Sequence, residues 1–421
     1  RVKAGEGIFP TLHVFPRRSA RLRPIAGLRR HGALFRNTPT PFAVPATKMP
    51  VMSRHPSFLV VGSGCVGSFI ATTLGKNGAS VTLKARAAPQ GSVAKLMAKA
   101  GVDVITDLTP LEREIGAGNR PPLDAIFVAT KTYHFDDVAS ELAQAGPALR
   151  PTLATVGCYN GHVLGVENLF GRIGASSAAG PSTFFKALVP GGYSFKEDGS
   201  GFDVTNAGQK WSLLSTTPES RTLAKHMSSY GVASVAGGFE ADTRKYLVNT
   251  TANLVSVIAN TNCNGLVNDP ALLARMRAIF REAATVLRAA PAHREHFPSA
   301  ISVEELEEQV LTGIASYKEH YPSSCKDFRA GRDIEISSLN GYICDLGKQL
   351  GMETPVNKAV VDDVAVVLRR QQSADAEAAE RAPMAPKPTL PEPLLRRTIP
   401  GFGARILPQP VGSVSATAHR R

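Results

Sequence analysis

The feature that most constrains this chain is a glycine-rich turn between a short apolar run and a helical pattern. Residues 58–61 (FLVV) form an apolar, β-branched run of the length expected for a buried parallel strand. Apolar residues then recur at helical spacing, at Val66, Phe69, Ile70 and Leu74. Between them the glycines follow the pattern G-x-G-x-x-G, at Gly62, Gly64 and Gly67. This strand, turn and helix predict a dinucleotide-binding fold.

Each glycine has a physical role in that prediction. Gly62 permits the tight turn, Gly64 lets the backbone approach a diphosphate, and Gly67 allows close packing of helix on strand. The helix N-terminus adds free N–H groups and the positive end of the helix dipole. The predicted cofactor-binding residues of this turn are Gly62, Ser63, Gly64, Cys65, Val66 and Gly67. The alternative is a glycine turn that binds no ligand.

The end of the second strand, predicted at residues 79–83, indicates which dinucleotide is bound. An NAD site usually has Asp or Glu there for the ribose 2′-hydroxyl, but residues 7–102 contain no carboxylate. Lys84 and Arg86 stand at this strand end instead, and a guanidinium binds a 2′-phosphate bidentately. We therefore predict NADP(H), the alternative being that both cations are solvated loop residues.

Two further apolar strands are predicted within residues 123–135 and 151–161, with a helix at 136–146 between them. The first strand ends near Lys131 and the second near Asn160. Ligands bind at the carboxyl ends of parallel strands, so both residues are candidate site residues, although either could be an ordinary loop residue. Further strands are predicted after residue 210, and the α/β part of the chain ends near Gly238.

The pattern then becomes helical. Residues 239–260 carry Lys245, Asn249 and Asn253 at i, i+4 and i+8, so all three lie along one side of a helix. This polar stripe is either solvated surface or the wall of a cleft. Further helices are predicted around 270–288, 302–318 and 335–350. The fold class is thus an α/β Rossmann-like dinucleotide-binding domain followed by an all-α domain.

The net charge of +13 is concentrated at the two ends of the chain. Residues 1–48 carry ten Lys/Arg and one Glu, and residues 372–421 carry seven basic and four acidic residues. The stretch between them is nearly neutral, which argues against a nucleic-acid partner. No uncharged apolar run is long enough for a membrane span. The five cysteines are scattered and suggest neither disulfides nor a metal site, so we expect an intracellular protein.

Four segments follow from these patterns. Residues 1–56 are a basic leader, 57–238 the NADP-binding domain, 239–371 a helical substrate and catalytic domain, and 372–421 a disordered proline-rich tail. The leader is Arg-rich and almost acid-free, so it is either a mitochondrial transit peptide or upstream sequence that the mature protein lacks. The expected compartment is accordingly the mitochondrion or the cytoplasm.

Several motifs in order make the chain resemble the ketopantoate reductases (2-dehydropantoate 2-reductases) over about residues 57–371. They are GSGCVG with Arg86 downstream, ATK ending at Lys131, NG at 160–161, RKYLVNTTAN at 244–253, CNG at 263–265 and SSCKDFRAGRDIEISSLNGYI from Ser323. The resemblance implies a helical half like the C-terminal domain of 6-phosphogluconate dehydrogenase. It also implies NADPH-dependent reduction of ketopantoate to pantoate, a step of pantothenate and coenzyme A biosynthesis, by a monomer or homodimer.

The resemblance also assigns roles to residues. Lys245 looks like the catalytic lysine, and Glu335 like the glutamate that assists it and lies close to the cofactor. Arg86 and Lys131 match positions associated with the NADP phosphate. Positions similar to the family's substrate-binding residues are Asn160 (also near the nicotinamide), Asn249, Asn253, Asn264 and Ser323. On this interpretation Lys245 donates to the carbonyl oxygen as negative charge develops there, so no metal is needed.

The chain departs from the family pattern at three places. The run serine–methionine–leucine–glutamine–aspartate reads SSCKD here, the acidic-aromatic pair after the glutamate and isoleucine is Ser337-Ser338, and one residue is missing between Asn253 and Asn264. These changes affect the substrate pocket rather than Lys245 and Glu335. A reductase of another branched 2-oxo acid and a non-catalytic NADP-binding regulator therefore stay open as alternatives. Retention of both Lys245 and Glu335 speaks against the regulator.

Overall fold

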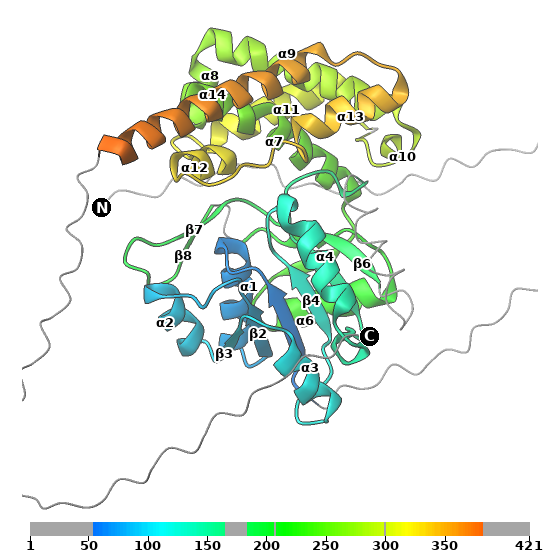
Figure 1. The fold of residues 1–421 in the computed structure, drawn as a ribbon. Coiled ribbons are helices and arrows are strands. Elements are labelled where there is room, and N and C mark those ends of the chain that lie inside the picture. The colour runs from blue at the N-terminus through cyan, green and yellow to red at the C-terminus, as the bar shows by residue number, and fades with distance from the viewer. Residues whose placement is uncertain (1–53, 165–182, 206–207, 299, 382–421) are drawn as a thin grey trace, which may run out of the picture. The chain divides into compact units, whose positions relative to one another are not determined.

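The structure is a computed structural model that describes residues 54–164, 183–205, 208–298 and 300–381. The predicted leader lies outside these residues up to residue 53, and the predicted tail lies outside them beyond residue 381. None of the described helices is long and apolar enough to cross a membrane. The first half of the described chain is an α/β sheet structure and the second half is helical (Figure 1).

An eight-stranded sheet organises the first half, in the order β10-β9-β6-β5-β4-β1-β2-β3. All neighbouring pairs are parallel except β6 and β9. The strands are β1 (Ser57–Val61), β2 (Ser80–Lys84), β3 (Val102–Ile105), β4 (Ala125–Val128), β5 (Ala154–Gly157), β6 (Phe184–Leu188), β9 (Trp211–Leu213) and β10 (Ser234–Ala236). A separate antiparallel hairpin consists of β7 (Tyr193–Phe195) and β8 (Phe202–Val204).

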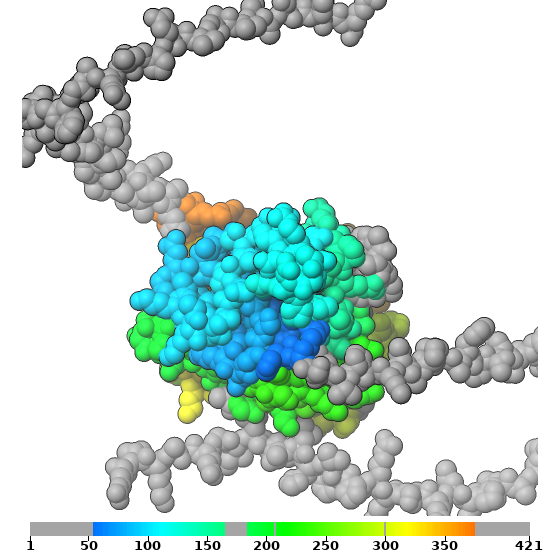
Figure 2. Space-filling view, turned by 90° about the horizontal axis from the view of Figure 1, so that it is seen from below, coloured from blue at the N-terminus to red at the C-terminus, as the bar shows by residue number. Residues whose placement is uncertain are grey.

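Helices cover both faces of this sheet because its strands are apolar on both sides. In β1, Phe58 and Val60 pack with residues of α1, α2 and α6, whereas Leu59 and Val61 pack with residues of α3 and α4. The helices are α1 (Cys65–Lys76), α2 (Gly91–Lys99), α3 (Thr109–Gly116), α4 (Phe135–Gln144) and α6 (Pro218–Ser229), with 3-10 turns η1 (Thr132–His134) and η2 (Pro147–Leu149). Seen from below, this half covers most of the visible face (Figure 2).

The glycine-rich turn has the geometry that its spacing predicts. Gly62 has φ +111°, and a Cβ there would lie 2.7 Å from the carbonyl oxygen of Ala129. A Cβ on Gly67 would lie 1.9 Å from the carbonyl oxygen of Gly62, so α1 packs tightly on the turn. At Gly64 nothing lies within 4 Å of the position that a Cβ would take. The turn is therefore closed toward the sheet and open on its outer side.

The helical half is built around α7 (Phe239–Ala259), which packs against α8, α9, α11, α12 and α14. The residues of α7 that form the core include Leu247, Leu254 and Val257, each fully buried. The other helices are α8 (Cys263–Asn268), α9 (Pro270–Ala289), α10 (Pro291–Arg294), α11 (Val303–Ser316), α12 (Ser323–Arg329), α13 (Asn340–Leu350) and α14 (Pro355–Arg381). The fold is thus the predicted α/β domain followed by an all-α domain.

Two boundaries differ from the prediction. The helix expected from residue 335 begins at Asn340, because residues 335–339 form turns closed by backbone bonds such as Leu339 N–H to Ile336 O. At the other end, α14 continues to Arg381 through residues that composition assigned to the disordered tail. Residues 374–381 (ADAEAAER) are good helix formers, and the first proline comes only at Pro383.

Candidate active site

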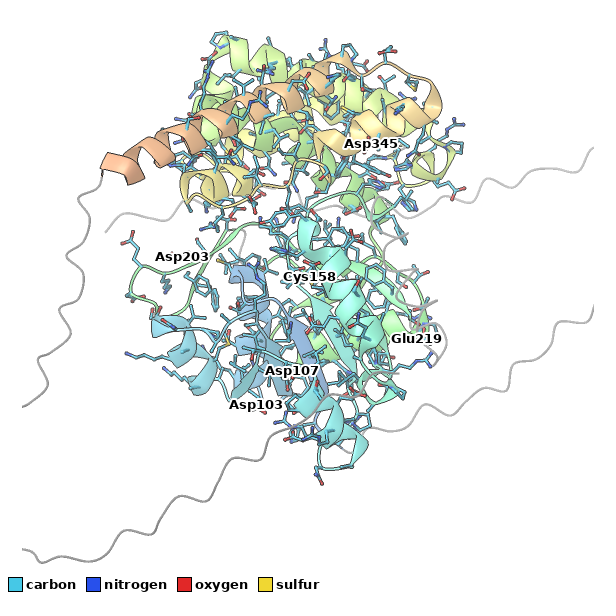
Figure 3. All side chains as sticks on the ribbon, viewed as in Figure 1. Asp103, Asp107, Cys158, Asp203, Glu219 and Asp345 are labelled. Atoms are coloured by element: carbon cyan, nitrogen blue, oxygen red, sulfur yellow. The ribbon has the colours of Figure 1, made fainter. Side chains whose placement is uncertain are left out.

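The predicted strand-end residues lie at one edge of the sheet. β5, β4 and β1 are neighbours, and their carboxyl ends lead to Asn160, Lys131 and Gly62. Cys158, labelled in Figure 3, directly follows β5 and marks this edge, on the side of the sheet toward the helical half. Strand order alone therefore brings together three segments that are far apart in sequence.

Glu335 joins this edge to the helical half. Its carboxylate accepts hydrogen bonds from Asn160 Nδ2 at 2.9 Å, from Lys131 Nζ at 3.2 Å and from Thr132 N and Oγ1 at 3.2 Å each. The carboxylate is almost completely buried, because the turns before α13 direct it onto the end of β4. Sequence reasoning named Glu335, Lys131 and Asn160 separately, and the structure places them in direct contact.

A second carboxylate from the helical half also binds Lys131. Asp327 Oδ2 lies 2.6 Å from Lys131 Nζ, and Asp327 Oδ1 lies 2.8 Å from a guanidinium nitrogen of Arg332. Burial opposes the charge on Lys131, but Glu335 and Asp327 outweigh it and raise the pKa of this lysine. Lys131 is therefore a fixed cation. Sequence reasoning assigned no role to Asp327, Thr132 or Arg332.

The polar stripe on α7 meets the same network at Asn249. Asn249 Nδ2 donates to Asn160 Oδ1 at 3.3 Å, and Lys245 Nζ donates to the carbonyl oxygen of Val189, just after β6. Asn253 is only 3% exposed, and its amide nitrogen has no hydrogen-bond partner among the described residues. A buried amide donor without a partner is costly, so this atom is suited to a polar ligand.

The surroundings of Lys245 weaken its hold on a proton. Burial and the neighbouring ammonium of Lys186 lower the pKa of Lys245 to about 8, against the opposing effects of Asp242, Cys158 and Glu335. A lysine with this pKa is protonated at neutral pH and can give up its proton readily. Glu335 acts on Lys245 through its charge, because the described residues show no hydrogen bond between the two.

Two predicted substrate residues stand apart from this network. Asn264 is exposed on α8, where its amide donates to Glu319 Oε1 at 3.2 Å and accepts from Asn268 Nδ2 at 2.8 Å. Ser323 is the first residue of α12 and is half-buried.

The glycine-rich turn offers donors to an anion. No side chain caps the N-terminus of α1, and its first turn contains no acidic residue. Burial raises the pKa of the Cys65 thiol, while the charges of Arg332 and Lys326 from the helical half act in the opposite direction. Lys326 and Arg332, the latter paired with Asp327, thus add positive charge near the start of α1, where free N–H groups suit an anion.

Of the two cations at the end of β2, Lys84 has an ion-pair partner and Arg86 has none among the described residues. Lys84 Nζ lies 2.6 Å from Glu141 Oε2 of α4, an ion pair that sequence reasoning missed. Arg86 is exposed and has no ion pair or hydrogen bond among the described residues. Glu141 follows Lys84 by 57 positions, so no local sequence pattern predicts this ion pair.

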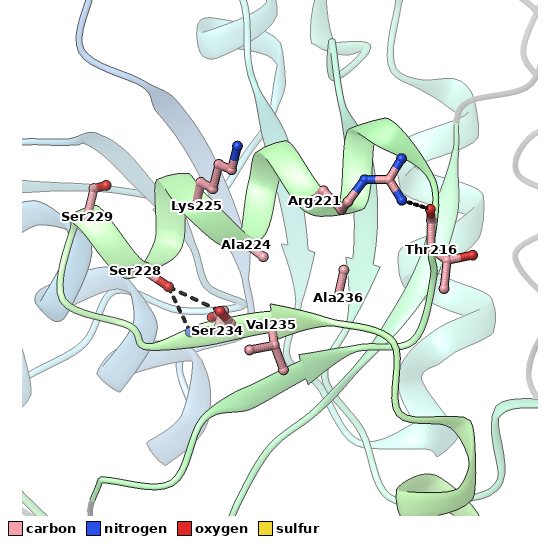
Figure 4. Close-up of a pocket in the computed structure, with 9 residues that line it drawn as sticks. All are labelled: Thr216, Arg221, Ala224, Lys225, Ser228, Ser229, Ser234, Val235 and Ala236. Atoms are coloured by element: carbon pink, nitrogen blue, oxygen red, sulfur yellow. Dashed lines mark hydrogen bonds between the residues drawn. The ribbon is translucent and has the colours of Figure 1, made fainter. Parts of the chain in front are cut away.

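A surface pocket of about 540 Å³ lies away from this network, between α6 and β10 (Figure 4). Its lining includes Arg221, Lys225 and Ser229, and Arg221 donates to the carbonyl oxygen of Thr216. None of the predicted site residues lines this pocket. Among the described residues, no cluster of His, Cys, Asp or Glu could hold a metal ion.

Comparison with known families covers both halves of the chain. The family model described as ketopantoate reductase PanE/ApbA matches residues 58–202, and the model of its C-terminal domain matches residues 240–367. The 2-dehydropantoate 2-reductase of Aquifex aeolicus is 29% identical over 145 residues, 33% of this chain and 44% of that protein. The uncharacterized oxidoreductase YkpB of Bacillus subtilis is 24% identical over 316 residues, 72% of this chain and 96% of that protein.

Solved structures show the same fold. A PanE/ApbA family ketopantoate reductase from Ralstonia eutropha JMP134 has a TM-score of 0.56 at 18% identity, over 75% of this chain and 99% of that one. D-mandelate dehydrogenase, in a complex with NADH and anilino(oxo)acetate, has a TM-score of 0.58 at 18% identity, with the same coverage of the two chains. The family models match both halves, and the chain therefore belongs to the ketopantoate reductase family of oxidoreductases.

Proposed function

We propose that this protein reduces a 2-oxo acid with NADPH, and that its first candidate substrate is 2-dehydropantoate (ketopantoate), which gives pantoate. The observation that carries the proposal is the lowered pKa of Lys245 together with its place beside two asparagines on α7. This lysine has a pKa of about 8 and shares one side of α7 with Asn249, which contacts the network, and with Asn253, whose buried amide nitrogen has no partner among the described residues. A proton donor and amide donors on one side of a helix suit a carbonyl substrate that carries a carboxylate.

The residues after β1 and β2 fit a nicotinamide dinucleotide. The free N–H groups at the start of α1 would hold its diphosphate, and the open space beside Gly64 would let the diphosphate approach the backbone. Arg86 is the free cation suited to a 2′-phosphate, which favours NADPH over NADH. When bound, this cofactor would supply the hydride.

The chain's own residues then have distinct tasks. Lys245 gives its proton to the carbonyl oxygen as the carbonyl carbon accepts the hydride, so the products are the 2-hydroxy acid and a neutral lysine that solvent reprotonates. Asn249 and Asn253 donate hydrogen bonds to the polar groups of the substrate and hold it in one orientation. Glu335 favours the charged form of Lys245 and fixes Asn160 through its 2.9 Å hydrogen bond.

A second candidate is the reduction of another 2-oxo acid by the same residues. The observation that favours it is Lys326, a half-buried lysine whose ammonium has no ion pair or hydrogen bond among the described residues. Burial lowers its pKa, and it stands where the family has a neutral glutamine, one helical turn after Ser323. A substrate with an additional acidic group would neutralise this cation. D-mandelate dehydrogenase also shows that this fold accommodates a different 2-oxo acid.

The test is a substrate panel with purified protein. NADPH oxidation is followed with ketopantoate, with other branched 2-oxo acids, with an aromatic 2-oxo acid and with a 2-oxo dicarboxylic acid, and NADH is used in a parallel series. Highest kcat/KM with ketopantoate supports the first candidate, and highest kcat/KM with a dicarboxylic acid supports the second. The absence of turnover with every member of the panel, alongside normal NADPH binding, would instead favour a regulator.

A further inference from the structure

Lys186 is a charged residue in the middle of a buried strand. β6 reads FFKAL, and this lysine is only 3% exposed. Removing an ammonium from water is costly unless charged and polar groups replace the water, so a lysine at this position calls for an explanation. The motifs that identify the family do not include it.

The ammonium of Lys186 is held from two sides. Its Nζ lies 2.5 Å from Asp242 Oδ1 and 2.5 Å from the carbonyl oxygen of Gly161. The other carboxylate oxygen, Asp242 Oδ2, accepts the N–H of Val163 at 2.9 Å. Burial alone would raise the pKa of Asp242, but Lys186 and the surrounding donors hold it below its usual range. The two side chains therefore form a buried ion pair that two further hydrogen bonds hold in place.

This pair lies next to the candidate proton donor. Asp242 precedes Lys245 by three positions on α7, and Lys245 donates to Val189, the residue directly after β6. Burial raises the pKa of the Cys158 thiol, after β5, to about 12, and the charges of Lys245 and Lys186 oppose that rise. The buried pair of Lys186 and Asp242 and the half-buried Lys245 thus lie in one region at the end of the sheet.

We propose that Lys186 is a positioning residue for Lys245: paired with Asp242 one helical turn before the donor, it holds a buried positive charge that sets the electrostatic environment of the donor. This inference rests on the proposed function, because it assumes that Lys245 is the donor. The inference adds a residue of β6 to the candidate active site and gives a reason for a lysine in a buried strand.

The titratable groups around Lys245 define what a substitution should do. Lys186 acts on it from β6, Asp242 from α7, Cys158 from the end of β5, and Glu335 from the segment before α13. Among these groups, Lys186 has the largest effect on Lys245 and is the one that opposes its protonation, whereas Cys158, whose pKa burial raises to about 12, is an uncharged thiol. Removing the charge of Lys186 should therefore raise the pKa of Lys245 and move the alkaline loss of its protonated form to higher pH.

Three variants of the full chain separate charge from packing. Lys186→Met removes the charge but leaves Asp242 buried and unpaired, which threatens folding. The double variant Lys186→Met with Asp242→Asn removes both charges and keeps the volumes, and Lys186→Arg keeps the positive charge. Lys225→Met, which changes a lysine at the surface pocket, is the matched control. Thermal unfolding shows which variants are folded.

The first readout is the pH dependence of kcat/KM for 2-oxo acid reduction. The second is the rate of trace acetylation at Lys245, measured by mass spectrometry as a function of pH, which reports the neutral amine without any substrate. We expect both alkaline transitions to move upward by about 1 pH unit in Lys186→Met and by less in the double variant. They should stay in place in Lys186→Arg and in the Lys225→Met control.

An unchanged acetylation transition in a folded Lys186→Met or double variant would overturn the inference, because a purely structural ion pair would leave the proton affinity of Lys245 alone. If Lys186→Met does not fold, the double variant decides the question. The acetylation curve also separates this inference from the proposed function. Wild-type protein that reduces no 2-oxo acid would refute the function, whereas the curve would still show whether Lys186 acts on Lys245.

Discussion

Lys131 and Lys245 belong to different halves of the chain, and their surroundings shift their pKa values in opposite directions. Lys131, after β4, has two carboxylate partners from the helical half, which raise its pKa. Lys245, on α7, is bonded to a backbone carbonyl and lies near a second ammonium, and its pKa falls to about 8. One lysine therefore keeps its proton and joins the two halves, while the other can exchange its proton near neutral pH.

The strongest test of this difference is Lys245→Ala. Loss of the donor to the developing alkoxide should reduce turnover by about 10²–10⁴-fold. NADPH affinity should stay close to normal, because the residues suited to the dinucleotide belong to the sheet half. Turnover with the best substrate of the panel and NADPH fluorescence provide the two measurements.

The matched control for that substitution is Arg244→Ala, which removes the neighbouring cation of α7, paired with Gln309. It should change turnover little, since surface substitutions have small effects. Turnover near the wild-type value in Lys245→Ala would contradict the assignment of the donor.

A smaller loss is expected from Glu335→Gln, which keeps the shape of the side chain but removes its charge. Lys131 then retains one of its two carboxylates, and Lys245 loses a charge that favours its protonated form. Turnover should fall by about 10–10²-fold, and combining this change with Lys245→Ala should add little if the two residues act as a unit.

Glu308→Gln is the control for the glutamate, because it changes an exposed partner of Arg277 that Glu307 also binds. Kinetics of the single and double variants measure the coupling. Fully multiplicative losses would mean that Glu335 acts independently of Lys245.

The cofactor prediction concerns a third cation, Arg86, which has neither the carboxylates of Lys131 nor the burial of Lys245. We expect the wild-type protein to prefer NADPH over NADH by about tenfold or more, and Arg86→Ala to weaken NADPH far more than NADH. Dissociation constants for both cofactors test this. Arg113→Ala, on the exposed side of α3, is the control, and equal use of both cofactors by the wild type would refute the prediction.

Local patterns were enough to predict that Lys131 and Asn160 stand at the carboxyl ends of strands of one sheet. They were not enough to predict the contacts that these residues make with the helical half. The glycine spacing, the apolar runs and the helical spacing along residues 239–260 each depend on a few neighbouring residues, and the turn, the strands and the helix that they predict are confirmed. The resemblance contributed Glu335, which periodicity had placed inside a helix. The structure instead puts it in an irregular segment before α13, where its carboxylate reaches Lys131, 204 positions away in the chain.

The pairs that sequence reasoning missed are formed by residues from distant elements. Lys84 meets Glu141 and Lys186 meets Asp242 only because strands and helices pack in one particular way. The signal for Lys186 was present as a charge within the apolar run FFKAL, which is unfavourable in a buried strand unless a partner is supplied. The signal for Glu141 was absent, because a helical glutamate is ordinarily a solvated surface residue.

The mildest test leaves the protein unaltered and follows its pH dependence. Reduction needs Lys245 protonated, so kcat/KM, which reports the free enzyme, should decline as the pH rises through about 8. An ordinary lysine would retain its proton to a pH of about 10.4, and the raised pKa of Lys131 produces no transition at lower pH. Lys245→Arg should lack this decline in whatever activity it retains, since a guanidinium stays charged throughout. A wild-type profile that stays flat to about pH 10 would show that Lys245 holds its proton as firmly as Lys131, and the distinction between the two lysines would be lost.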